Sequence, residues 1–201
     1  MSDACCPPPA SSDPRYRRIL WIALAVNAGM FLVELAGSAT SGSTALAADA
    51  IDFAGDAANY GLSLAAIAAS AVWASRTALL KGFGMAAFGI GVLALCGWRI
   101  WSGRPPEPRT MGVIGTLALA ANLSVAWLLY AYREGDANMR SVWLCTRNDA
   151  ISNLAVLVAA AGVFGTGTVW PDVAVAALMA SLALTSAVTV IRGARSELAL
   201  H

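Results

Sequence analysis

Six long apolar runs, separated by short polar or proline-containing stretches, take up most of this chain of 201 residues. A helix needs about 20 apolar residues to cross the hydrocarbon core of a bilayer, so runs of this kind leave little chain for a second domain. Only 12% of the residues are charged and 58% are hydrophobic, whereas soluble domains are roughly a quarter charged. The sequence therefore predicts an all-α, polytopic membrane protein with six transmembrane helices.

The polar stretches divide the chain into three parts. Residues 1–14 are rich in proline, serine and aspartate, and they predict a disordered cytosolic tail. Residues 15–192 form the predicted transmembrane domain, with helices expected at about 19–36, 43–71, 82–101, 110–132, 141–164 and 170–192. Residues 193–201 are predicted to be a short cytosolic tail.

Lysine and arginine fall mostly on one side of these predicted spans. The loops and tails on the side of the termini hold nine of them, whereas the opposite loops hold only Arg99, Arg104 and Arg109. Cytosolic loops carry the excess of such residues, so both termini are predicted to lie in the cytosol. The sequence contains no organelle address, which favours a bacterial cytoplasmic (inner) membrane.

Charge and motifs argue against several classes of protein. The net charge of +1 lacks the basic character of a nucleic-acid binder, so no nucleic-acid partner is expected. The apolar segments contain neither a histidine nor a nucleotide-binding loop, so we expect neither an enzyme nor a prosthetic group.

The four cysteines do not have the spacing of a disulfide framework. Cys96 stands alone in an apolar run and is expected to be a small buried side chain. Cys5 and Cys6 are adjacent in the tail, where they either capture a soft metal ion or have no role.

Five acidic residues interrupt the apolar runs, namely Glu34, Asp49, Asp52, Asp56 and Asp149. Each costs at least about 2–3 kcal/mol at the bilayer centre unless it is paired, hydrated or protonated. Asp49, Asp52 and Asp56 are spaced by three and then four residues, so their carboxyl groups lie along one stripe of a helix. Either a bound cation relieves their repulsion, or the acids are protonated or line a water-filled packing defect.

Cys145 and Asp149 repeat the four-residue spacing on the fifth predicted helix. If this helix faces the second one, Asp52 and Asp56 meet this pair, and three carboxylates and one thiolate form a roughly tetrahedral site. This donor set suits zinc-like ions, since magnesium and calcium prefer more oxygen ligands and copper(I) prefers more sulfur. Asp52, Asp56, Cys145 and Asp149 are the predicted metal ligands.

Other polar residues lie close to this site in the sequence. Asn153 follows Asp149 by one turn and is expected to orient its carboxylate. Asn27 and Glu34 are seven residues apart, so they share a face of the first helix, where they either gate the site or pack against other helices. Asp172 follows Pro171 and is expected to cap a helix at the membrane surface.

Two stretches of the chain resemble the cation diffusion facilitator family. The matching patterns are Asn27-x-x-Met30-x-x-x-Glu34, Ser41-Gly42-Ser43-x-Ala45-Leu46-x-x-Asp49-Ala50-x-Asp52-x-x-x-Asp56, Arg147-Asn148-Asp149-Ala150-x-x-Asn153-x-Ala155-Val156, and Trp170-Pro171-Asp172 with Met179-Ala180. The resemblance implies an exporter of zinc, cadmium or cobalt ions that works by proton antiport, usually as a dimer with a cytosolic C-terminal domain. It also implies that Asp49 lies beside the ligands or where the metal enters.

The chain departs from the family pattern at two points. Zinc-type members usually carry histidine where this chain has Cys145, so softer ions such as cadmium become credible substrates. The chain also ends soon after the sixth predicted helix. We therefore expect the family's cytosolic domain to be absent and any homodimer to form through the transmembrane helices.

The expected mechanism follows from charge. Clustered carboxyl groups and a thiol in an apolar bundle hold protons until a cation arrives, and the binding of the cation expels them. If the bundle opens alternately to each side, the inward proton gradient drives metal export. Two other functions stay open at this point: a non-transporting metal-binding subunit or sensor, and a proton-coupled exporter of organic cations.

Overall fold

The computed structural model describes residues 14–65, 71–132 and 137–199. These residues form α1 (Pro14–Ser41), α2 (Thr44–Ala65), α3 (Ala71–Ser102), α4 (Pro108–Leu129), the short 3-10 helix η1 (Tyr130–Tyr132), α5 (Ala137–Thr166) and α6 (Trp170–Leu198). No strand occurs in the described part of the chain, and the all-α prediction is confirmed. Cys5, Cys6 and almost all of the predicted N-terminal tail lie outside the described residues.

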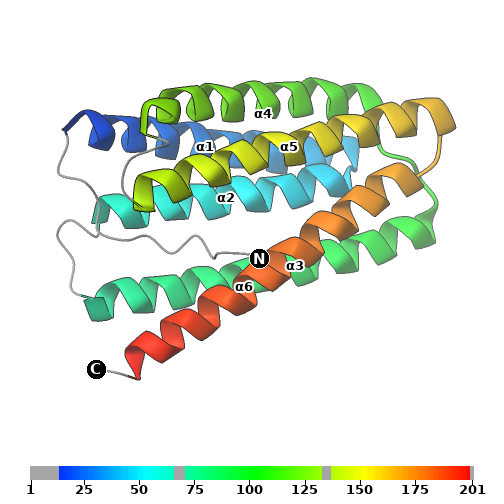
Figure 1. Cartoon of the computed structure of the whole chain (residues 1–201). Helices are drawn as coiled ribbons and strands as arrows, with labels where there is room; N and C mark the ends of the chain where they lie inside the picture. The colour runs from blue at the N-terminus through cyan, green and yellow to red at the C-terminus, as the bar shows by residue number, and fades with distance from the viewer. Residues whose placement is uncertain (1–13, 66–70, 133–136, 200–201) are drawn as a thin grey trace.

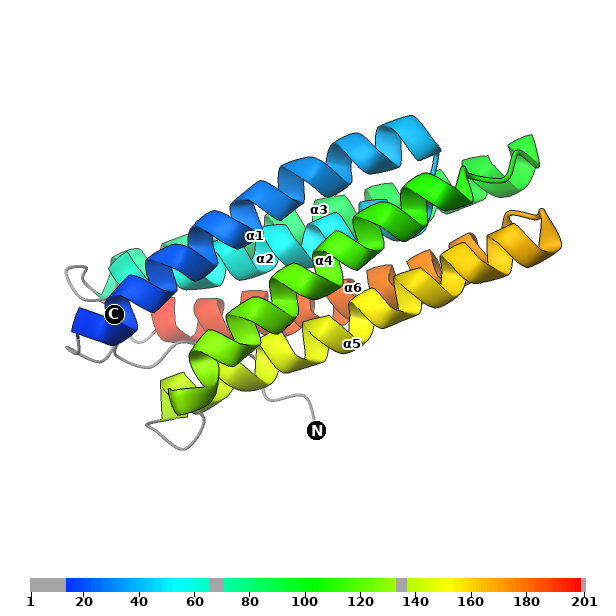
Figure 2. The same cartoon turned by 90° about the horizontal axis from the view of Figure 1, so that it is seen from above.

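The helices form two groups. α1, α2, α4 and α5 pack together, and α3 and α6 form a close pair that lies against α2 and α5 (Figure 1). Viewed from above, α1, α4 and α5 cover α2, α3 and α6 (Figure 2). α2 contacts α1, α3, α5 and α6, which makes it the central helix. The start of α1 and the end of α6 lie at the same end of the bundle, as six crossings require (Figure 1).

Five of the helices are long and apolar enough to cross a membrane: α1, α3 from Ala78, α4 with η1, α5 from Asp149, and α6 to Ser196. α2 is not among them because it carries Asp49, Asp52 and Asp56 within its 22 residues. Its four neighbours screen α2 from lipid, so a helix with three acids can still cross. The chain is a multi-pass membrane protein.

Several helices extend further than their apolar runs. α3 begins at Ala71, whereas Arg76 and Lys81 led to an expected start after Lys81. α5 begins at Ala137 instead of about 141, and α6 continues to Leu198, into the predicted C-terminal tail. These predicted ends were wrong because hydropathy marks the part of a helix inside the bilayer, while the backbone hydrogen bonds continue beyond it.

Local side-chain bonds explain where α2 and α4 begin. Ser43 Oγ accepts a hydrogen bond of 3.1 Å from the Leu46 backbone N–H, so Ser43 is the N-cap of α2. Gly42 before it has φ +76°, a left-handed conformation that favours glycine. Glu107 caps α4, and hydrogen bonds from the Thr110 side chain and backbone hold the pKa of this exposed carboxyl below its usual value.

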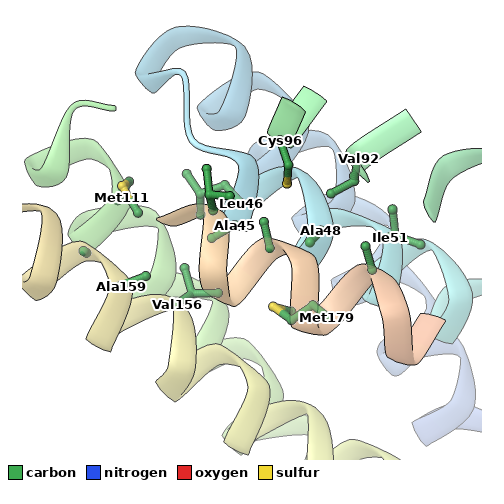
Figure 3. Close-up of a cluster of buried hydrophobic side chains, with 14 of the residues drawn as sticks. Ala45, Leu46, Ala48, Ile51, Val92, Cys96, Met111, Val156, Ala159 and Met179 are labelled. Atoms are coloured by element: carbon green, nitrogen blue, oxygen red, sulfur yellow. The ribbon is translucent and has the colours of Figure 1, made fainter. Parts of the chain in front are cut away.

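Two apolar clusters fill the bundle at different levels. The larger one, which we call the upper cluster, surrounds the first turns of α2 and includes Ala45, Leu46, Ala48, Ile51, Val92, Cys96, Met111, Val156, Ala159 and Met179 (Figure 3). The lower cluster contains Tyr16, Leu20, Ala23, Tyr60, Val125 and Leu129. Cys96 is buried, as predicted. Along α2, Asp52 and Asp56 come after the residues of the upper cluster and before Tyr60 of the lower cluster.

Candidate metal centre

α2 and α5 bring two of the four predicted metal ligands together. The Asp56 and Asp149 carboxyl groups lie against each other across the two helices. About one turn further along, Tyr60 Oη and Thr146 Oγ1 are 2.8 Å apart, and both residues are buried. The second and fifth helices therefore face each other through polar side chains at this level of the bundle.

The hydrogen bonding of the Asp56 and Asp149 carboxyl groups is incomplete among the described residues. Asp56 is only 9% exposed, and Asp149 Oδ2 is buried without a hydrogen-bond partner among the described residues. Lys81 on α3 donates to Asn59 Oδ1, and its charge also acts on Asp56. Two carboxylates in contact repel each other unless a proton or a cation lies between them, so the arrangement favours cation binding.

The structure shows less about the other two predicted ligands, Asp52 and Cys145. Asp52 is half-buried on α2, where the charges of Asp49 and Asp56 act on it. Cys145 lies on α5 one turn before Asp149, but its side chain is outside the described part of the structure. Among the side chains that are described, no three of His, Cys, Asp or Glu converge closely enough to hold a metal ion. The site of four ligands stays a prediction.

A chain of amide groups leads from α4 through α5 to Asp49. Asn122 Nδ2 donates to Asn153 Oδ1 at 2.8 Å, and Asn153 Nδ2 donates to Asp49 Oδ2 at 2.7 Å. All three side chains are at most 2% exposed. Asn153 thus holds Asp49, whereas the sequence led us to expect that it orients Asp149. Sequence reasoning missed Asn122, although an amide inside an otherwise apolar run was an available signal.

Glu34 approaches the same cluster from α1. Its carboxyl group is fully buried beside that of Asp49, and neither oxygen has a hydrogen-bond partner among the described residues. Asn27 is also fully buried on α1, where its Nδ2 donates to the Ala23 carbonyl at 2.8 Å. Both predicted residues of the first helix therefore face the interior of the bundle, and Glu34 is the one that lies next to an acid.

Asp172 fixes the start of α2 from the start of α6. Its Oδ1 accepts hydrogen bonds from Ser43 Oγ at 2.6 Å and the Ala45 backbone N–H at 3.0 Å. Its Oδ2 accepts from the Thr44 backbone N–H at 2.8 Å and from Thr44 Oγ1 at 2.5 Å. The predicted capping role is therefore correct in kind, but the carboxylate caps α2 from a neighbouring helix. This places α2 firmly against α6 at the beginning of the helix.

The sequence of this chain is similar to those of known proteins. The family model of the cation efflux transmembrane domain matches residues 20–77 and 73–199. The zinc transporter ZitB of Escherichia coli (strain K12) is 30% identical over 200 residues, which cover 92% of this chain and 63% of that protein. A cadmium, cobalt and zinc/H(+)-K(+) antiporter of Bacillus velezensis is 25% identical over 187 residues, which cover 85% and 59%. This chain thus spans less than two thirds of the length of either relative.

Proposed function

This chain belongs to the cation efflux family, and on that premise we propose that it exports a divalent cation of the zinc, cadmium or cobalt type across a bacterial cytoplasmic membrane in exchange for protons. The contact between the carboxyl groups of Asp56, which is buried, and Asp149, which is half-buried, carries the proposal. Two acids that meet in an apolar bundle require a positive charge, and a dication supplies it in one step. The names of the two relatives, a zinc transporter and an antiporter, support this function.

Asp52, Asp56, Cys145 and Asp149 are the ligands in this proposal. Cys145 lies four residues before Asp149, so both belong to one face of α5. A thiolate among three carboxylates suits zinc and favours softer ions more than an all-oxygen site does. The protons held by these groups leave as the metal binds, which links metal binding to proton release.

The apolar clusters set the conditions for transport. The residues of the upper and lower clusters lie on either side of Asp52 and Asp56 along α2. A cation at this level reaches water only when helices separate at one cluster or the other. Opening past each cluster in turn exposes the site to the two sides alternately, and an inward proton gradient then drives the cation outward.

The experiment is uptake of zinc, cadmium and cobalt into proteoliposomes with an imposed pH gradient. We compare the wild type with Asp56→Asn and Asp149→Asn, which remove one charge each at nearly constant volume. Glu107→Gln is the matched control, because it removes the charge of an exposed acid outside the spans. We expect gradient-dependent uptake in the wild type and the control, and a loss of at least about tenfold in both aspartate variants.

A further variant, Cys145→His, tests the role of the thiol, and it should raise the uptake of zinc relative to cadmium because imidazole is a harder ligand than thiolate. Metal that binds in a carboxylate-dependent manner without crossing the bilayer would instead indicate a subunit or sensor. Uptake that both aspartate variants retain would contradict the proposed site.

A further inference from the structure

Glu34 and Asp49 form a second acidic pair, distinct from Asp56 and Asp149. Glu34 is fully buried and Asp49 is 1% exposed. The two carboxyl groups come from different helices and lie side by side, yet neither oxygen of Glu34 has a hydrogen-bond partner among the described residues. A buried carboxyl group without a partner loses the solvation it had in water, so this position requires a ligand that donates.

The surrounding helices bring no positive charge to this pair. Residues 19–65, 82–98, 110–132 and 148–191 contain no Lys, Arg or His. The charged groups that act on Glu34 are Asp49 and Asp52, both on α2. On α5 the nearest acid is Asp149, on which the charge of Asp49 acts. Residues 110–129 of α4 contain no ionisable side chain, and residues 82–98 of α3 and 173–191 of α6 contain only Cys96.

The amide chain distinguishes the two acids. Asn153 donates a hydrogen bond to Asp49, and Asn122 holds Asn153 in that orientation. A hydrogen bond donated to a carboxyl oxygen stabilises its charged form, and Glu34 receives no such bond. With one proton bound to Glu34, the pair carries a single negative charge. That charge is then on Asp49, the acid that accepts a hydrogen bond from Asn153. At the far end of this amide chain, Asn122 Oδ1 is also buried and has no hydrogen-bond partner among the described residues.

We propose that Glu34 and Asp49 are a proton-binding site that is separate from the metal ligands and couples proton movement to metal movement. This inference rests on the proposed function. Asp49 precedes Asp52 by three residues on α2, so a dication bound at Asp52, Asp56 and Asp149 lies about one turn away. Its charge repels the proton, the O–H bond of Glu34 breaks, and the proton passes to water. The pair then holds two negative charges instead of one, about one turn from the bound metal, and a returning proton reverses both changes.

The number of protons released per zinc ion bound tests this site. We measure the heat of zinc binding to the purified full chain in detergent, in buffers of different ionisation enthalpy, which gives that number directly. Glu34→Gln should release about one proton fewer than the wild type and keep its zinc affinity within about tenfold. Asp49→Asn should show the same loss and serves as the second variant if Glu34→Gln does not fold. Glu107→Gln should release as many protons as the wild type.

Infrared spectroscopy of the metal-free protein provides a readout that does not depend on transport. We expect protonated carboxyl absorption at neutral pH in the wild type and a weaker absorption in Glu34→Gln, where only the part due to the metal-binding acids remains. An unchanged proton count together with an unchanged band would overturn the proposal, and a folded Glu34→Gln that no longer binds zinc would make Glu34 a metal ligand instead. If the wild type binds no metal, the proposed function fails, while the infrared band still decides whether the pair holds a proton.

Discussion

The buried acids of this bundle differ in how fully they are hydrogen-bonded. Asp172 accepts four hydrogen bonds, Asp49 accepts one from Asn153, and Glu34 accepts none within the described residues. A carboxylate that accepts several hydrogen bonds already has its charge compensated, so we assign it a structural role. A carboxyl group with none is placed for a ligand, which is why we assign Glu34 to proton binding and Asp172 to the positioning of α2.

For single residues, the sequence predicts relative positions correctly where the period of one helix determines them. The spacing of Asp49, Asp52 and Asp56 predicted one acidic stripe, because three- and four-residue steps return to the same face. The hydrogen bond between Asn122 and Asn153 joins residues 31 positions apart on two helices. No local pattern contains that contact, since it depends on how α4 and α5 pack.

Replacing Asn153 by alanine should destabilise the protein. The change leaves Asp49 Oδ2 and Asn122 Nδ2 without their present partners in an apolar interior. We expect a loss of about 1–2 kcal/mol in the free energy of unfolding, measured by thermal unfolding in detergent. Ser124→Ala is the control, because Ser124 is exposed and its hydroxyl bonds only within its own helix. Equal stability of the two variants would show that the amide chain contributes nothing.

The helices themselves were predictable to different degrees. The start of α2 follows from the capping chemistry of Ser43, so its predicted position was correct. The start of α3 was predicted too late, because Arg76 and Lys81 interrupt the apolar pattern but not the helix. Charged residues are tolerated at the ends of transmembrane helices, where they reach the headgroups, so sequence pattern alone locates the span better than the helix.

Asp172→Ala should weaken the docking of α2 against α6. The variant removes four hydrogen bonds to Ser43, Thr44 and Ala45, all of them in the buried first turn. We expect a loss of about 2 kcal/mol or more in the free energy of unfolding, again from thermal unfolding in detergent. Glu107→Ala, at the exposed N-cap of α4, should cost less. A larger loss from Glu107→Ala would contradict the assigned role of Asp172.

The close approach of α3 and α6 depends on a glycine. A Cβ atom at Gly82 would lie 2.6 Å from Ile191 Cγ1, whereas a Cβ at Gly84 meets nothing within 4 Å. Gly82→Val should therefore separate the two helices and cost about 1–3 kcal/mol of unfolding free energy, while Gly84→Val should be tolerated. Thermal unfolding of both variants compares two identical substitutions on one helix. Similar destabilisation of both would mean that helix packing is not the cause.

For the whole molecule, the arrangement explains how three aspartates cross the membrane on one helix. α2 contacts four other helices, and outward-facing side chains such as Leu80, Trp101 and Trp127 are apolar and mostly exposed. Hydropathy predicted six spans and the order of the helices. It could not predict that α3 and α6 pair with each other, because that pairing arises from contacts between residues far apart in the sequence.

The predicted orientation is open to a direct test in cells. Arg104, between α3 and α4, and Ser196, near the end of α6, are both exposed and lie at opposite ends of the bundle. Arg104→Cys should react with a membrane-impermeant maleimide in intact cells, and Ser196→Cys only after permeabilisation. Mass spectrometry of the labelled peptides separates these thiols from the native ones. The reverse pattern would place the termini outside the cytosol.

The central claim is that one dication binds between α2 and α5, and X-ray absorption at the zinc edge tests it most directly. Zinc bound to the wild type in lipid should show one sulfur ligand at about 2.3 Å and oxygen ligands at about 2.0–2.2 Å. Cys145→Ser should remove the sulfur signal, and Asp149→Asn should remove bound zinc. A zinc ion held by two sulfurs, or one that persists unchanged in Asp149→Asn, would contradict a site between these helices.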